Sequence, residues 1–209
     1  MKVLLINGSP NAKGCTYTAL TEVAGALKKE GIETEIFHVG NAAIRGCIGC
    51  WACSKNPDRH CVFNDDIVNT AIEKIKEADG YIFGSPVHFA GASGFLTPFL
   101  DRIFVAAKPF MEYKPGACIS SARRSGTTAT FDQLNKYFSI SNMPIVSANY
   151  WNMVHGGSPE DVKQDLEGLQ IMRTLGRNMA WMLKCIELGK KNGIDVPEKE
   201  EAVKTNFIR

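Results

Sequence analysis

The stretch KVLLINGSPNAKGCT, residues 2–16, decides the fold because it joins a buried strand to a helix through a short polar loop. The apolar run from Lys2 to Ile6 predicts a short buried strand. From Thr16 to Lys29, apolar residues recur with helical spacing, and Gly31 is expected to end that helix. A loop that leaves a strand and opens a helix gathers backbone N–H groups and the positive end of the helix dipole, an arrangement that holds phosphate.

The rest of the chain continues this alternation. Further strands are expected at Ile32–Val39, Tyr81–Gly84, Ala117–Ser121 and Ile145–Ala148. Further helices are expected at 65–78, 95–104 and 127–138, and from Ser158 to about Leu188. Such alternation implies parallel strands joined by right-handed crossovers, with helices on both faces of the sheet. We predict one α/β domain over residues 1–189 and a charged tail over residues 190–209.

The composition favours small-molecule partners. The chain has 209 residues, 44% of them hydrophobic, and a formal charge of +2. Lysine and arginine are interleaved with aspartate and glutamate, which argues against a nucleic-acid surface. The sequence shows neither a signal-peptide pattern nor an apolar run near the ~18 residues of a membrane span, so we expect a cytoplasmic protein without a membrane partner.

The first loop matches neither of the two common nucleotide-binding patterns. A Rossmann fingerprint needs G-x-G-x-x-G, and a Walker A loop needs a lysine after its second glycine, whereas Lys13 precedes Gly14 here. The hydroxyls of Ser9 and Thr16, with the N–H groups of Cys15 and Thr16, form instead a neutral cradle suited to a monophosphate such as that of FMN. The alternative is ordinary helix capping by Thr16, with Ser9 in a turn.

The loop GSPVHFAGASG, residues 84–94, suits a flat ring. Pro86 stiffens an extended turn, and Gly91 permits close backbone approach, so that backbone amides can meet the polar edge of a flavin. Three side chains can lie along the ring: Val87, His88 and Phe89. We assign His88 no proton-transfer role, and packing in the core is the alternative for Phe89.

Two segments taken together resemble the NADPH-dependent FMN reductase family: GSPNAKGCT at residues 8–16 and GSPVHFAGASGFLTPFLDRI at residues 84–103. The resemblance spans about residues 1–150. It implies a flavodoxin-like three-layer sandwich with a five-stranded parallel sheet of order 2-1-3-4-5. It also implies FMN as cofactor, NADPH or NADH as co-substrate, and assembly as a homodimer or homotetramer.

Carried over position by position, the resemblance assigns expected FMN contacts. The phosphate is placed on Ser9, Cys15 and Thr16, and the isoalloxazine against Pro86, Val87, His88 and Phe89. The family commonly has Arg at the place of Asn11 and Asn at that of Cys15, so phosphate contacts here are expected to rest more on backbone and hydroxyl donors, with Asn11 among the loop contacts. At His88 the family often has Tyr.

A third loop, SSARRSGTT at residues 120–128, borders the flavin in the resembling family and adds three expected contacts: Ser120, Arg123 and Gly126. An arginine there can neutralise charge on the N1 to O2 edge of the flavin, or bind the phosphate of a nicotinamide nucleotide. A solvated pair of Arg123 and Arg124 is the alternative. Tyr150 and Trp151 either cover the flavin of a neighbouring subunit or only pack.

Four of the seven cysteines lie in GCIGCWACSKNPDRHC, residues 46–61. Cys47, Cys50, Cys53 and Cys61 have spacing that suits an iron–sulfur cluster or zinc, because a tight loop can bring thiolates so spaced to one point. The alternative is a set of reduced thiols without a metal, and disulfides are the least favoured use. The run also resembles the compact cysteine motif of the iron–sulfur flavoproteins, which implies a 4Fe-4S cluster.

We therefore predict an FMN-dependent NAD(P)H oxidoreductase that passes electrons to a small-molecule or protein acceptor. This chemistry belongs to the flavin, so no side-chain acid or base is required for the hydride step. The alternative of a different class is an iron–sulfur electron carrier with a protein redox partner. A third reading takes the flavin as a regulatory ligand only.

Overall fold

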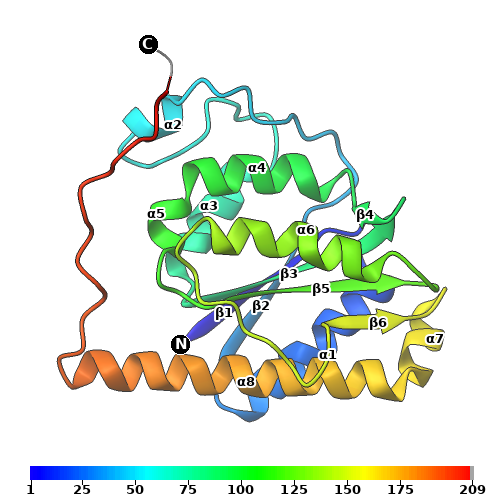
Figure 1. Cartoon of the computed structure of the whole chain (residues 1–209). Helices are drawn as coiled ribbons and strands as arrows, with labels where there is room; N and C mark the ends of the chain where they lie inside the picture. The colour runs from blue at the N-terminus through cyan, green and yellow to red at the C-terminus, as the bar shows by residue number, and fades with distance from the viewer. Residues whose placement is uncertain (208–209) are drawn as a thin grey trace.

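The computed structural model describes residues 1–207 as a parallel sheet between two layers of helices (Figure 1). The strands are β1 (Lys2–Asn7), β2 (Glu33–His38), β3 (Gly80–His88), β4 (Gly91–Ala92), β5 (Gly116–Ala122) and β6 (Met153–His155). The helices are α1 (Cys15–Lys29), α2 (Ala52–Lys55), α3 (Val68–Glu77), α4 (Leu96–Ala106), α5 (Lys108–Met111), α6 (Thr127–Ser139), α7 (Pro159–Gln164) and α8 (Leu166–Lys191).

The predicted sheet topology is confirmed. The parallel strands run in the order β2-β1-β3-β5-β6, which is the flavodoxin-like order once the short β4 is set aside. β4 is an addition that sequence reasoning missed: it pairs with the end of β3 in antiparallel register, Val87 opposite Ala92 and His88 opposite Gly91. The end of β3 therefore extends beyond the sheet as a hairpin.

The fifth strand was predicted at Ile145–Ala148, and that prediction is wrong. Ile145 forms only an isolated bridge with Gly116, and the last strand is β6, where Met153 pairs with Ser120. Val146 is buried in the core. Ile145 is exposed, so the apolar pattern indicated burial correctly for Val146 alone, and burial of one residue does not make a segment pair along a sheet edge.

The sheet separates two hydrophobic cores, because successive residues of a strand point to opposite faces. Leu4 and Ile6 pack with α3, α4 and α6, whereas Val3 and Leu5 pack with α1 and α8. The packing of α8 on α1 is close: a Cβ added at Gly176 would lie 2.7 Å from Ala26 Cβ. The first and last helices of the domain therefore form one layer.

Two predicted helix boundaries need correction. The helix expected from residue 65 begins at Val68, because Asp66 turns to Arg102 and its carboxylate accepts a hydrogen bond from the Val68 N–H. The long helix expected from Ser158 is two helices. Ser158 caps α7 as expected, but Asp165 interrupts the run and caps α8 through the N–H of Gly168 at 2.9 Å.

After α8 the described chain, residues 192–207, has no regular secondary structure. It runs from the end of α8 past α5 toward α2 (Figure 1), and Lys199 forms an ion pair with Glu112. The last two residues of the tail expected at 190–209 lie outside the described residues. No helix within residues 1–207 combines the length and the apolar character needed to cross a membrane.

Candidate functional site

The three loops singled out by the sequence come together at the carboxyl ends of β1, β3 and β5. The N–H of Gly8 donates to the carbonyl oxygen of Gly84 at 2.8 Å, which joins the first loop to the end of β3. The hydroxyl oxygens of Thr16 and Ser121 lie 2.8 Å apart and join the first helix to β5. Gly8 is required here, since a Cβ would lie 2.9 Å from the Gly84 oxygen.

The first loop presents an uncapped helix start. Gly14 is the N-cap of α1, and no side chain in the described part of the chain caps the helix. The N–H groups of its first turn therefore have no partner within the helix. Asn7 shapes the loop from inside: its amide donates to the Ala12 carbonyl at 3.1 Å and accepts from the Ser9 N–H at 3.2 Å. Sequence reasoning missed Asn7 because it reads as the end of a strand.

The predicted phosphate contacts have mostly internal partners. The Ser9 hydroxyl accepts from the Asn11 N–H at 3.1 Å, and Asn11 itself is exposed. The Cys15 thiol points toward the Gly156 carbonyl, and burial raises its pKa, so it stays a neutral thiol. Thr16 is buried against Ser121. What remains for an anion is the set of backbone donors at the start of α1, and this donor set fits the monophosphate of FMN.

The second loop is the β3–β4 hairpin, which carries all four residues predicted along the flavin ring. Pro86 and Val87 are half-buried, and His88 is exposed. Phe89 is also fully exposed, so its alternative placement in the core is wrong. Phe89 and Ala90 both have positive φ, 51° and 58°, a conformation that costs a non-glycine residue about 1–2 kcal/mol.

Two contacts hold this hairpin in place against α6. The Ala92 N–H donates to Gln133 Oε1 at 2.8 Å. Gly126, with φ of 87°, fits so closely that a Cβ there would lie 2.9 Å from Ala90 Cα. Strained backbone held by neighbours is typical of ligand-binding turns. Gln133 was not predicted, since nothing in a helical glutamine points to a hairpin far away in the sequence.

The residues predicted in the third loop differ in their exposure to solvent. Ser120 is fully buried, and its hydroxyl donates to the Thr127 carbonyl at 3.3 Å. Arg123 and Arg124 are exposed, and a Cβ at Gly157 would lie 3.9 Å from the Arg123 side chain. Gly126 begins α6 beside the hairpin. The loop thus supplies a neutral wall with cationic groups at its outer edge.

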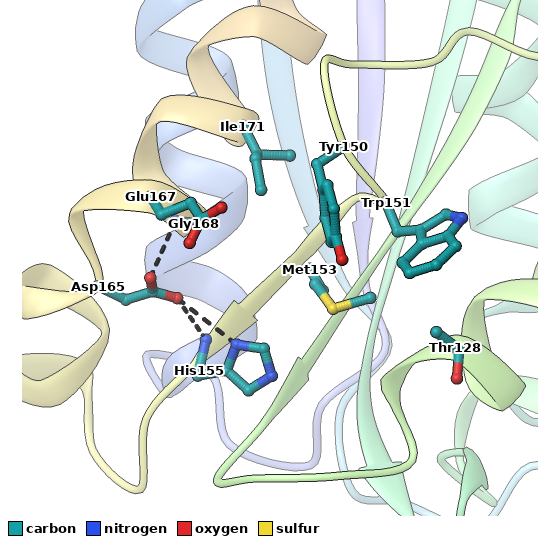
Figure 2. Close-up of a pocket in the computed structure, with 9 residues that line it drawn as sticks. All are labelled: Thr128, Tyr150, Trp151, Met153, His155, Asp165, Glu167, Gly168 and Ile171. Atoms are coloured by element: carbon teal, nitrogen blue, oxygen red, sulfur yellow. Dashed lines mark hydrogen bonds and ion pairs between the residues drawn. The ribbon is translucent and has the colours of Figure 1, made fainter.

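A cavity of about 340 Å³ opens beside β6 and the start of α8 (Figure 2). Tyr150 and Trp151 form its aromatic wall, with ring centroids 5.0 Å apart. Asp165 and Glu167 also line it, and Asp165 accepts from the His155 N–H at 2.7 Å. Carboxylates repel phosphate, so this cavity does not fit the phosphate of FMN.

The four cysteines of the 46–61 segment line a single small cavity beside α4. Cys47 and Cys50 are exposed, Cys53 is buried and Cys61 is half-buried. Within residues 1–207, no three His, Cys, Asp or Glu side chains are gathered closely enough to hold a metal ion. Four soft sulfur donors around one hollow nevertheless fit an iron–sulfur cluster in kind.

The floor of this cavity includes a buried arginine that the sequence did not single out. Arg102 is 1% exposed, and its Nε donates to Cys61 Sγ at 3.3 Å. The signal was a charged residue on a helix whose neighbours Phe99 and Ile103 belong to the core. Its carboxylate partner, Asp66, lies in the loop before α3.

Comparisons with known proteins show which family this chain resembles. A family described as NADPH-dependent FMN reductase matches residues 1–158. The chain is 35% identical over 195 residues to an iron-sulfur flavoprotein of Methanocaldococcus jannaschii, covering 90% of this chain and 100% of that protein.

Solved structures show the same fold at low sequence identity. RosB with bound 8-demethyl-8-formylriboflavin-5′-phosphate matches with a TM-score of 0.68 and 15% identity, over 100% of this chain and 94% of that one. A flavodoxin from the domain Archaea matches with a TM-score of 0.61 and 15% identity, over 88% of this chain and 99% of that one.

Proposed function

The chain belongs to the NADPH-dependent FMN reductase family and is an FMN-containing oxidoreductase, and from this premise we propose that it passes electrons from NADPH or NADH to a second acceptor. The observation that carries the proposal is the convergence of three loops on the uncapped start of α1. A helix start with free N–H groups beside a rigid hairpin suits a phosphate joined to a flat ring.

The mechanism needs little from side chains. FMN, when bound, supplies the hydride chemistry at its N5. The N–H groups at Cys15 and Thr16 would hold the phosphate, and the hairpin residues 86–89 would orient the ring. Arg123, exposed at the edge of the third loop, is available to the phosphate of an incoming nicotinamide nucleotide.

A second function, electron carrier to a protein partner, is favoured by the cavity that all four cysteines line and by the name of the relative of Methanocaldococcus jannaschii. Cys47, Cys50, Cys53 and Cys61 would hold a 4Fe-4S cluster, which supplies one-electron exchange. The two functions share the FMN site, so they differ in the acceptor rather than in the flavin. We further propose that residues 1–189 act as one FMN-binding domain, in a homodimer or homotetramer.

The test is anaerobic purification followed by quantitation of flavin, iron and acid-labile sulfide in one sample. About one FMN with about four iron per subunit would support the carrier. FMN without iron would support the reductase function instead. In that case, bleaching of the flavin absorbance by NADPH or by NADH would identify the electron donor. A protein that takes up no FMN would refute both proposals.

A further inference from the structure

Arg102 is a buried cation that neither the flavin site nor the core requires. It lies on α4 among apolar residues and is 1% exposed. Burial of a guanidinium is costly unless its charge is paired and its N–H groups are satisfied. The contacts of Arg102 therefore indicate what this position serves.

These contacts are made to Cys61 and to residues that flank the cysteine segment on both sides. Nε donates to Cys61 Sγ at 3.3 Å. One terminal nitrogen pairs with Asp66 and also donates to the Arg45 carbonyl at 3.4 Å, while the other donates to the Phe63 carbonyl at 3.1 Å. One side chain thus fastens both ends of the cysteine loop to α4.

Cys61 is held more firmly than the other cysteines. Its N–H donates to Asn69 Oδ1 at 2.8 Å, and the Asn69 amide donates back to the Cys61 carbonyl at 3.1 Å. Cys47 and Cys50, by contrast, are exposed on the loop. Cys61 therefore has both its backbone and its sulfur fixed by partners from helices, and its sulfur accepts a hydrogen bond from a guanidinium that also pairs with Asp66.

We propose that Arg102 is a positioning residue that sets the direction of Cys61 Sγ and raises the reduction potential of a 4Fe-4S cluster held by the loop. This inference rests on the proposed cluster. A hydrogen bond and a positive charge at a ligand sulfur stabilise the form that carries the additional electron. The reaction is reduction of the cluster by one electron, which dithionite supplies in the test below, and no bond is made or broken.

The decisive variant is Arg102→Lys in the FMN- and iron-loaded protein. In lysine a methylene, Cε, takes the place of Nε, so the bond to Cys61 is lost, while the ammonium can still pair with Asp66. We expect the midpoint potential, followed by electron paramagnetic resonance during dithionite titration, to fall. A threefold to tenfold change in the reduction equilibrium is expected, and tenfold corresponds to about 59 mV for one electron.

The matched control is Asp66→Asn, which keeps the Nε–H bond and leaves the positive charge less neutralised. Its midpoint potential should be equal to that of the wild type or higher. An equal fall in both variants would mean general loosening of the loop and would overturn the proposal. Equal potentials in Arg102→Lys and wild type would overturn it as well.

A second experiment keeps Arg102 and can be done even if Arg102→Lys fails to fold or to hold iron. Protein labelled with nitrogen-15 arginine, with Arg45 and Arg59 replaced by lysine, should show hyperfine coupling between the reduced cluster and the label. Absence of coupling would overturn the proposal. A wild type that binds no iron would overturn both this inference and the carrier function, whereas the other negative results leave the carrier function intact.

Discussion

Replacement of Gly126 by alanine tests whether the third loop and the hairpin form one rigid wall. The new Cβ would lie 2.8 Å from Val87 Cγ1 and 2.9 Å from Ala90 Cα, at a residue with φ of 87°. The left-handed conformation costs about 1–2 kcal/mol for alanine, and overpacking costs about 1–3 kcal/mol. Together the loss of stability should be about 2–5 kcal/mol, or about 4–20 °C in melting temperature for a chain of this size.

The assay is urea unfolding followed by circular dichroism, together with FMN titration of the folded protein. The substitution would push the hairpin out of place. If returning it to its native position on FMN binding costs about 1.4 kcal/mol, the affinity for FMN falls about tenfold. The matched control is Gly25→Ala in the interior of α1, where the new Cβ would have no described atom within 4 Å apart from the adjacent residues and backbone of its own helix; this variant should gain about 0.5–1 kcal/mol of stability. Wild-type stability of Gly126→Ala beside a stabilised control would refute the reasoning.

Further predictions concern the phosphate loop, the cysteines and acid stability. If the Thr16 hydroxyl turns from Ser121 to the phosphate when FMN binds, Thr16→Val should weaken FMN binding, measured by flavin fluorescence, by about 1–3 kcal/mol, whereas unchanged affinity would show that only the backbone donors serve the phosphate. Cys50→Ser should abolish iron binding with FMN retained, whereas Cys185→Ser on the exposed side of α8 should keep both; loss of FMN along with iron in Cys50→Ser would make the loop structural. Hydrogen bonds from Lys2 and a second lysine lower the pKa of Glu35 from its ordinary value of 4.5. The ionised carboxylate therefore stabilises the fold fully above about pH 4.5, and this stabilisation is lost as the pH falls through the lowered pKa. Between about pH 6 and pH 3 the free energy of unfolding should therefore fall less in Glu35→Gln than in the wild type. The difference should be at most about 1 kcal/mol because the ion pair is partly exposed, and an equal pH dependence in the two proteins would contradict this.

The sheet and the three loops could be predicted because both follow from local pattern. Val3 to Ile6 is apolar throughout, as expected for a strand covered on both faces, and parallel topology brings the loops after such strands to one edge. The fifth strand could not be placed, because Val146 and Met153 are both buried and only continuous pairing along β5, which residues 153–155 make, distinguishes the two segments.

The parts of the site that the sequence does not reveal depend on contacts between distant residues. Asp165 looks like a helical residue until His155 and Gly168 both donate to it and make it a cap. Arg102 looks like a surface residue until Asp66, 36 positions earlier, pairs with it. Hydrogen-bond partners of this kind are set by tertiary packing, which periodicity does not report.

The shared layer of α1 and α8 has a consequence for how the protein is made. During synthesis the first helix leaves the ribosome before most of the sheet, but its neighbour, residues 166–191, emerges only after all the strands. Until then one side of the sheet, including Val3 and Leu5, lacks part of its cover. Nascent chains that stall before α8 therefore expose apolar surface and become clients for chaperones and proteases, so a premature stop in this region should yield little soluble product even though the loops proposed to bind FMN have been translated.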